Sequence, residues 1–336
     1  RDGSSCHHLK NLIPAITPYN YRRCLLCSDD RQPRTILEQG HIDNHLRMLT
    51  AAGIDPVMSV CMGSLNVAEC YRLDNRGALA PGKRADIVLF NNLQEFRARM
   101  VFIKGKKVAE DGRYLPPVEK TPISSVRGSM NVKPFTIDNL KMHLLSDRVR
   151  AIGIIKDGIM TRSEVITVKR DEEGDFIFDP YEPVAKIAVL ERHHSTGKIG
   201  LGFLKNYGIQ KGAIALSVAH DSHNIICVGV SNEEMYAAIQ ALIDQEGGFV
   251  LVENGQVIAS LPLPIAGLMS DLTGEEVSQR LKHLHDTAYD RLGVSRETEP
   301  VMTLCFMSLI VIPELKISTR GLFDVSQFNF VSPEAF

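Results

Sequence analysis

A serine and two aspartates in the first part of the chain have the types and the position that hydrolytic chemistry uses. Ser28, Asp29 and Asp30 directly follow the apolar run 24–27, which we expect to be a strand. In an α/β barrel the catalytic groups project from the carboxyl ends of strands. A carboxylate at such an end can bind a metal ion and take a proton from a bound water. Spacing alone favours the alternative, a turn in which these side chains cap the backbone.

A set of histidines with one aspartate lies in the second half of the chain: His193, His194, His220, Asp221 and His223. Only six residues join the strands expected at 213–218 and 225–230, so the last two histidines lie at one end of a hairpin. The first two follow an expected strand at 185–190 and can reach the same end. Neutral imidazoles beside an aspartate suit a metal ion or a purine. A hydrogen-bonded turn is the alternative.

Two further pairs have ligand-like spacing. His41 and His45 are four residues apart on an expected helix, where two side chains share one face. They form a possible ligand pair, although the charged residues beside them favour an exposed face. Cys24 and Cys27 have the spacing of a metal or redox pair. No second pair accompanies them, which favours two thiols in a buried strand.

Apolar residues at helical spacing follow the first expected strand. They predict one helix at 35–52 and a second at 56–70. The second helix should begin after the N-cap Asp55 and pack Val57 inward. One strand followed by two helices is an order of elements typical of an α/β layer or barrel.

From residue 73 the pattern changes to short β-type runs at 85–90 and 100–104, separated by turn residues, which predict a sheet or sandwich. A proline-rich polar stretch then reads as a linker. These patterns divide the whole chain into four segments: the end of a barrel-like unit (1–72), a β-sandwich portion (73–118), a linker (119–134) and an α/β domain (135–336).

Local signals in the last segment predict individual elements. Asn232 is expected to cap a helix. Asn254 and Gly255 form a strong hairpin signal between two apolar runs. Thr273 and Glu276 have the spacing of a capping box at the start of another helix.

The composition is that of an ordinary globular protein and excludes several classes of function. The chain has 336 residues, with 38 Lys and Arg against 40 Asp and Glu, for a net charge of −2. This balance argues against a nucleic-acid or anionic-membrane binder. No apolar run approaches the length of about 20 residues that crosses a bilayer. The seven cysteines are odd in number and scattered, which favours a reducing compartment, the cytoplasm. We also expect the chain to begin inside a domain, because Arg1 has no entry element before it.

Residues 53–90 resemble a known family. They read GIDPVMSVCMGSLNVAECYRLDNRGALAPGKRADIVLF. This is similar to the exit of a metal-dependent amidohydrolase barrel, where S-L-N-x-A is followed by G-x-L-A-P-G-x-x-A-D-I-V. In such a segment an aspartate like Asp86 is more often structural than a ligand.

Within that superfamily the rest of the chain resembles the adenine deaminases. The opening RDGSS, which includes Ser5, is similar to their R-E-G-S segment, with Asp2 in place of glutamate. The CSDDR segment resembles their T/S-D-D segment. Four longer motifs resemble the C-terminal domain of that family: ERHHSTGKIGLGF (191–203), KGAIALSVAHDSHNIICVG (211–229), LPLPIAGLMSD (261–271) and IPELKISTRGLFDV (312–325).

The resemblance implies an α/β fold: the last part of a (β/α)8 barrel, a β-sandwich portion and an α/β C-terminal domain. It implies hydrolysis of adenine to hypoxanthine and ammonia in purine salvage, by a homo-oligomer with two Mn²⁺ or Fe²⁺ ions. Asp29 then matches the aspartate that binds metal and carries the proton of the attacking water. The family's H-x-H pair is not in this chain, and the adjacent His7 and His8 do not replace it. We therefore expect that this chain alone does not assemble the metal pair.

Two other functions remain open. A dihydropyrimidinase-like amidohydrolase would act on a cyclic amide, but such enzymes lack the motifs at 191–325. A non-catalytic module that binds a purine or a partner fits the missing histidines.

Overall fold

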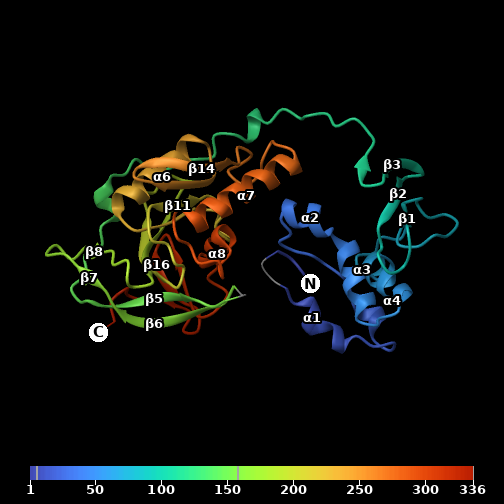
Figure 1. Cartoon of the computed structure of the whole chain (residues 1–336), viewed down its shortest axis with the longest axis horizontal. Coiled ribbons are helices and arrows are strands. Elements are labelled where there is room, and N and C mark those ends of the chain that lie inside the picture. Colours follow the sequence, from blue (N-terminus) through green and yellow to red (C-terminus); the bar gives the residue numbers. More distant parts are fainter. Residues whose placement is uncertain (5–6, 157–158, 336) are drawn as a thin grey trace. The chain divides into compact units, whose positions relative to one another are not determined.

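A computed structural model describes residues 1–4, 7–156 and 159–335, so Ser5 and Cys6 lie outside the described residues. The chain divides into two compact units, Arg1–Thr121 (unit 1) and Pro122–Phe336 (unit 2). Both are drawn in Figure 1. Together they make a mixed α/β protein. No helix within the described part is long and apolar enough to cross a membrane.

Unit 1 begins with short helices. The α-helices are α1 (Leu9–Leu12), α2 (Pro33–Gln39), α3 (Ile42–Ala51), α4 (Pro56–Gly63) and α5 (Leu65–Cys70), and the 3-10 helices are η1 (Ile13–Ala15) and η2 (Tyr21–Arg23). The single helix expected at 35–52 is wrong, because Gly40 ends α2 with φ 93°, a backbone that favours glycine. The helix expected at 56–70 is likewise interrupted at Ser64, whose ψ is −79°. Asp55 caps α4 as predicted, by accepting from the backbone N–H groups of Val57 and Met58.

The strand expected at 24–27 is not present. Cys24 has an extended backbone, but residues 24–27 join no ladder in the described chain. Their backbone bonds are isolated ones, from Cys24 N to Tyr21 O at 3.0 Å, from Leu26 N to Met62 O at 3.1 Å and from Asp2 N to Cys27 O at 3.2 Å. A strand requires a row of partners, and an apolar run does not contain that information. The inward packing expected of Val57 is also wrong, since its side chain is 63% exposed.

The rest of unit 1 is an antiparallel sheet of four strands in sequence order. They are β1 (Ile87–Phe90), β2 (Ala98–Ile103), β3 (Lys106–Glu110) and β4 (Arg113–Tyr114). The short strands expected at 85–90 and 100–104 are therefore confirmed. Asp86 accepts a hydrogen bond from Lys104 N at 3.0 Å and pairs with Arg84. The Arg84 guanidinium and this N–H lower the pKa of Asp86, as suits a structural residue of the turn.

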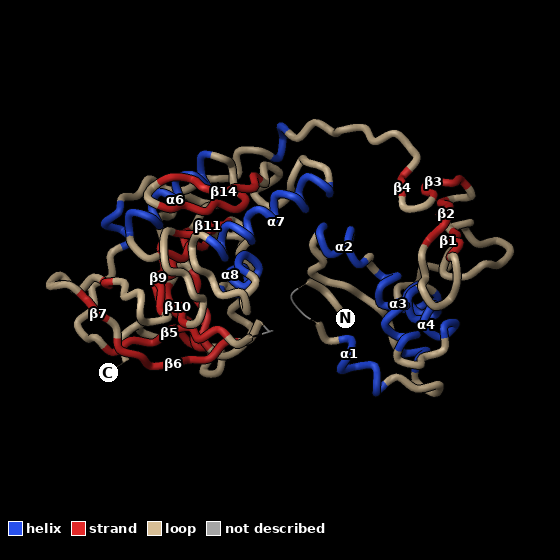
Figure 2. Tube along the Cα trace, in the orientation of Figure 1, coloured by secondary structure: helices blue, strands red, loops and turns tan. Residues whose placement is uncertain are grey.

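Unit 2 is built on an eight-stranded sheet of order β14-β13-β11-β12-β9-β10-β5-β6 (Figure 2). All neighbouring pairs are antiparallel except β10 and β5, which are parallel. The strands are β5 (Arg148–Ile154), β6 (Thr161–Thr167), β9 (Val184–Leu190), β10 (Ile199–Lys205), β11 (Ala213–Leu216), β12 (Ile225–Gly229), β13 (Gly248–Glu253) and β14 (Gln256–Pro262).

Both faces of this sheet are covered. Ala188 and Leu190 of β9 pack with α6 (Asn232–Asp244) in one core cluster. Ile187 and Val189 face the opposite way and join residues of the elements on the other face. Those elements are α7 (Gly274–Asp290), α8 (Pro300–Met307), β15 (Leu315–Ser318) and β16 (Gly321–Asp324). The remaining elements are η3 (Ser124–Val126), η4 (Ile137–Leu140), β7 (Lys169–Arg170), β8 (Phe176–Ile177) and β17 (Asn329–Phe330).

The local signals of unit 2 are mostly confirmed. The hairpin turn at Asn254 and Gly255 joins β13 to β14. Thr273 and Glu276 form the expected capping box at the start of α7. The cap of α6 is Ser231, one residue before the expected Asn232.

Candidate functional site

The loop that carries Asp29 lies against the first residues of the chain. Asp2 N donates to Cys27 O at 3.2 Å, and Ser4 N donates to Asp30 O at 3.1 Å. A Cβ on Gly3 would lie 1.8 Å from Asp30 Oδ1, so only glycine permits this approach. The RDGS and SDD segments, separate in sequence, therefore form one structural site in unit 1.

Asp29 presents its carboxylate at the surface of this site. Its φ is 62°, in the left-handed region that aspartate tolerates better than most residues. The side chain is 53% exposed, and Oδ2 lies 2.7 Å from Nη1 of Arg1. The loop thus holds Asp29 in a defined position while leaving it accessible to a ligand.

Asp2 and Ser28 are buried behind the loop, 5% and 7% exposed. Asp2 Oδ1 is 3.7 Å from His7 Nδ1, and its backbone oxygen accepts from Nη1 of Arg31 at 3.2 Å. Ser28 Oγ is 2.8 Å from His41 Nε2. Through these contacts Asp2 and Ser28 stabilise the loop that carries Asp29.

The exposed face expected for His41 and His45 is confirmed for His41 and wrong for His45. His45 is fully buried. Its Nδ1 and Nε2 each lie 3.0 Å from a backbone oxygen, of His41 and of Asp2 respectively. Burial lowers the pKa of His45, although the two carbonyl groups oppose this effect. His45 therefore fastens α3 to the loop of Asp2.

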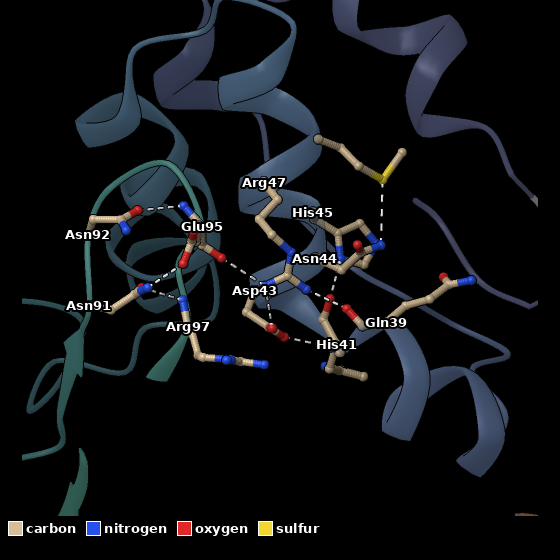
Figure 3. Close-up of polar contacts among 12 residues, drawn as sticks. Gln39, His41, Asp43, Asn44, His45, Arg47, Asn91, Asn92, Glu95 and Arg97 are labelled. Carbon is tan, nitrogen blue, oxygen red and sulfur yellow. Dashed lines mark hydrogen bonds and ion pairs between the residues drawn. The ribbon is translucent and has the colours of Figure 1, made fainter. Parts of the chain in front are cut away.

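The same helix is fastened at a second point (Figure 3). Arg47 Nη1 contacts Asp43 Oδ2 at 2.9 Å and donates to Glu95 O at 3.0 Å. Glu95 belongs to the loop between β1 and β2, which Asn92 closes by accepting from Glu95 N at 2.7 Å. These bonds fix the sheet of unit 1 against α3.

The described residues do not form a complete set of ligands for a metal ion. Within residues 1–4, 7–156 and 159–335, no three His, Cys, Asp or Glu side chains are placed to hold one. Asp29 offers one carboxylate, which is ion-paired to Arg1. Cys24 and Cys27 are free thiols, half-buried and exposed respectively, and the buried strand expected for them is not formed. The described residues therefore do not fit the pair of Mn²⁺ or Fe²⁺ ions that the resemblance implies.

Four histidines of unit 2 (His193, His194, His220 and His223) come together at one end of its eight-stranded sheet, the main sheet. Leu190 at the end of β9 pairs with Ile225 at the start of β12. The loops beyond these two residues therefore lie side by side. His193 Nε2 lies 2.8 Å from Ser222 O, so the expected approach of the first loop to the second is observed. The rings of His193 and His194 are 6.2 Å apart.

His220 is oriented by two neighbours. Its Nδ1 lies 2.9 Å from Oδ1 of Asp221, and its ring stacks on Phe306 with centroids 5.0 Å apart and an interplanar angle of 13°. The ring of His223 is 6.1 Å away. His223 has φ 51°, and its buried Nδ1 has no hydrogen-bond partner in the described structure. Burial lowers the pKa of His223, and the nearby His220 is the second largest cause of this lowering.

Glu191 anchors the first histidine loop, a role that the sequence did not indicate. Its carboxylate accepts from the backbone N–H of His193, of His194 and of Thr196, at 2.5, 2.8 and 3.0 Å. The Thr196 hydroxyl adds a fourth donor. Burial alone would raise the pKa of Glu191, but these donors outweigh it and lower the pKa to about 2. The carboxylate is therefore charged and holds the loop closed.

Arg192 anchors the second loop and was also missed. Its side chain is 1% exposed. The guanidinium donates to the backbone oxygens of His223, Ser129 and Ala266. Burial lowers the pKa of Arg192. Backbone carbonyl groups take the place of a carboxylate partner, because the negative ends of their dipoles point toward the guanidinium. The only sequence signal for either anchor was two charged residues at the end of an apolar strand.

Sequence comparisons match both units to known families. The model of the adenine deaminase C-terminal domain matches residues 158–329, half of the chain. The model of the amidohydrolase family matches residues 4–108.

Curated relatives match along nearly all of the chain. "Adenine deaminase 2" of Desulfotalea psychrophila is 50% identical over 335 residues, covering all of this chain and 58% of that protein. "Adenine deaminase" of Ligilactobacillus salivarius is 45% identical over 99% of this chain and 58% of its own length. The corresponding protein of Nitratidesulfovibrio vulgaris is 43% identical over 99% and 57%. The chain thus spans somewhat more than half the length of these relatives. Since half of the chain matches the adenine deaminase C-terminal domain and the relatives are 43–50% identical, the chain belongs to the adenine deaminase family.

Proposed function

We propose that this chain carries part of a hydrolytic adenine deaminase, which converts adenine and water to hypoxanthine and ammonia. The observation that supports this most is the similarity along the whole chain to proteins named adenine deaminase, at 43–50% identity. The arrangement around Asp29 is consistent with it, because a positioned and accessible carboxylate is what proton transfer requires.

In the proposed reaction Asp29 moves one proton. Its carboxylate takes the proton from the water oxygen that attacks C6 of the purine and gives it to the departing amino nitrogen, which leaves as ammonia. Arg1 would hold the carboxylate in place, and Asp30, Asp2 and Ser28 would position the loop. We propose Mn²⁺ or Fe²⁺ as the cofactor of the complete enzyme, and Asp29 is the residue of the described chain that we propose would bind it. The proton transfer described above is carried by Asp29 itself.

The finer features implied by the family are part of the same proposal. We propose that residues 1–72 complete a (β/α)8 barrel, that the four-stranded sheet belongs to a β-sandwich, and that the enzyme is a cytoplasmic homo-oligomer of purine salvage. The non-catalytic alternative, a purine- or partner-binding module, is favoured by one observation, the incomplete ligand set of the described residues.

An ammonia-release assay separates these functions. The chain is assayed alone and after fusion to the preceding segment of the Desulfotalea psychrophila relative. We expect adenine turnover by the fusion only. In the fusion, Asp29→Asn should lower kcat by at least about 100-fold, the size of a general acid–base contribution. A fusion that folds and binds metal but leaves adenine unchanged would contradict the proposed function.

Asp111→Asn is the matched control for Asp29. Asp111 has a positive φ of 45°, is 63% exposed and pairs with Arg99 at 2.8 Å, so it copies the local setting of Asp29 in the sheet of unit 1. It should keep kcat within about twofold of the parent fusion, because an exposed ion pair contributes little. Equal losses from both variants would remove the catalytic assignment of Asp29.

A further inference from the structure

We propose that the histidine loops of unit 2 form a binding site for an aminopurine, adenine in the first instance, carried by unit 2 itself. The site consists of His193, His194, His220, Asp221 and His223 over Phe306. Adenine is chosen because it is the substrate in the proposed function, and the inference rests on that function to this extent. The features that identify the ligand class are a stacking surface, a set of hydrogen-bond acceptors and two loops that are already fixed.

The stacking surface is the ring of His220. Phe306 lies parallel to it at 5.0 Å and is itself 7% exposed, so it supports the imidazole from the core. The side chain of His220 remains 31% exposed. His223, tilted by 49° at 6.1 Å, stands beside it. A rigid aromatic ring with one supported face suits a planar heterocycle better than an aliphatic or flexible ligand.

The polar groups around this surface mainly accept hydrogen bonds. Nδ1–H of His220 donates to Asp221 at 2.9 Å, and in this tautomer Nε2 is an acceptor. Asp221 is 79% exposed and has further lone pairs available. His193 Nε2–H donates to Ser222 O, so its Nδ1 is also an acceptor. Such a surface matches a ligand that donates.

Adenine donates through its exocyclic amino group and one ring N–H. Hypoxanthine carries a carbonyl oxygen where adenine carries the amino group, and an acceptor facing acceptors is unfavourable. The surface should therefore prefer adenine to hypoxanthine. The buried Nδ1 of His223 has no hydrogen-bond partner among the described residues, although buried polar atoms are nearly always paired.

Both loops are fixed before any ligand arrives. The buried carboxylate of Glu191 binds three backbone N–H groups of one loop, and the buried guanidinium of Arg192 binds the backbone oxygen of His223 in the other. Two buried charges are thus used to order loops at the surface. Such ordering reduces the entropy cost of binding. A metal ion is the less favoured occupant, because the described histidines and Asp221 do not converge as a group of three ligands.

Equilibrium dialysis of the 336-residue chain with radiolabelled adenine tests the site. We expect one saturable site and at least tenfold weaker competition by hypoxanthine than by unlabelled adenine. His220→Ala should weaken adenine binding at least tenfold. His220→Phe should keep the stacking but reduce the preference over hypoxanthine to less than threefold. His283→Ala, at an exposed histidine of α7, should bind adenine as the parent chain does.

Several results would overturn the site. These are no saturable adenine binding, equal losses in His220→Ala and His283→Ala, or loss of binding in Asp29→Asn, which would place adenine on unit 1. Zn²⁺ that binds in place of adenine and is lost in His220→Ala would assign the loops to a metal. Circular dichroism and melting of each variant ensure that losses are not failures to fold, and His220→Phe tests the site even where His220→Ala is unstable.

The binding assay tests the site in unit 2 and the deamination assay tests the proposed function, and a negative result in one does not contradict the other. A fusion that deaminates adenine while the 336-residue chain binds none leaves the proposed function intact and removes this site. A chain that binds adenine through His220 while the fusion releases no ammonia keeps the site and favours the binding-module alternative.

Discussion

The two units of this chain cover their apolar residues to very different degrees. In unit 1, Val88 and Leu89 of β1 point to opposite faces of the sheet, yet they are 44% and 47% exposed. In unit 2, every residue of β9 is buried, from Val184 to Leu190. Of β1 only Phe90 packs against the small core cluster of unit 1, whereas β9 is packed by elements on both sides.

Unit 1 also has an open apolar groove. A cavity of about 760 Å³ lies among α3, α4, α5 and β1, lined by Ile42, Leu46, Val60, Leu79 and other largely apolar residues. Together with the exposed Val88 and Leu89, this groove leaves apolar side chains of unit 1 uncovered. The comparison teaches that unit 2 buries its apolar residues in large core clusters, whereas unit 1 has a small core and leaves much apolar surface uncovered.

Separating the units gives the largest expected effect. Residues 122–336 expressed alone should unfold in one cooperative thermal transition, because the core clusters of the main sheet lie within them. Residues 1–121 alone should show no cooperative transition and should bind a dye for exposed apolar surface. Differential scanning calorimetry with dye fluorescence measures both. A sharp transition from residues 1–121 would show that their small core suffices, and the comparison would fail.

The next effect tests how unit 2 tolerates buried charge. Lys186 is 2% exposed and donates to Asp175, Asn232 and the backbone oxygen of Leu140. Burial tends to raise the pKa of Asp175, but the ammonium and the other donors lower it. Lys186→Met should therefore reduce the free energy of unfolding by about 3–5 kcal/mol, because it leaves a buried carboxylate without its cation.

Lys205→Met is the control for Lys186. Lys205 pairs with Glu164 at 2.7 Å, but both side chains are more than one quarter exposed. Urea unfolding should show a loss of at most about 1 kcal/mol. Similar losses in the two variants would indicate that the buried network contributes no more than a surface pair.

An acid titration has the next largest effect. Glu191 has a pKa of about 2 in the folded chain against an ordinary 4.5. A carboxyl group with a lowered folded pKa stabilises the protein fully above its unfolded pKa and loses that contribution as pH falls toward its folded pKa. Unfolding free energy should therefore decrease between about pH 5 and pH 2, by up to about 3 kcal/mol from this group. Glu191→Gln should be less stable at pH 7 and should lose less over the same window.

Glu172→Gln, at an exposed position, controls for the general effect of removing a carboxylate. Its acid dependence should follow that of the parent chain. If Glu191→Gln follows the parent as well, the four donors do not hold the charge as the geometry implies.

Sequence reasoning succeeded where the information is local. The turn at Asn254 and Gly255 needs only the conformations of those two residues, and the capping box of Thr273 and Glu276 spans one turn of helix. The convergence of the histidine loops followed from the short connection between two strands. The family assignment followed from long motifs and was confirmed by the comparisons.

Sequence reasoning failed where partners are distant. The run 24–27 has the apolarity of a strand, but no sequence pattern says which segment would pair with it. The periodicity of the apolar residues also did not show that Gly40 would end α2 and that a separate helix, α3, would begin after it. Lys186 interrupts an apolar strand by one charged residue, and its partners Asp175 and Asn232 lie 11 and 46 residues away. Buried charges of this kind are visible only when the fold brings their partners together.

The smallest effect tests the comparison with the same substitution in each unit. Val57 of unit 1 is 63% exposed, and Val228 of unit 2 is fully buried. Valine and threonine have nearly the same shape, so the substitution mainly adds a hydroxyl group. Val57→Thr should change unfolding free energy by less than about 0.5 kcal/mol, as surface changes usually do. Val228→Thr should cost about 1–3 kcal/mol, the penalty for burying a hydroxyl that gains no partner. Chemical denaturation of the full chain measures both. If Val57→Thr costs as much as Val228→Thr, the surface of α4 is covered in solution, and the difference between the units is smaller than the structure indicates.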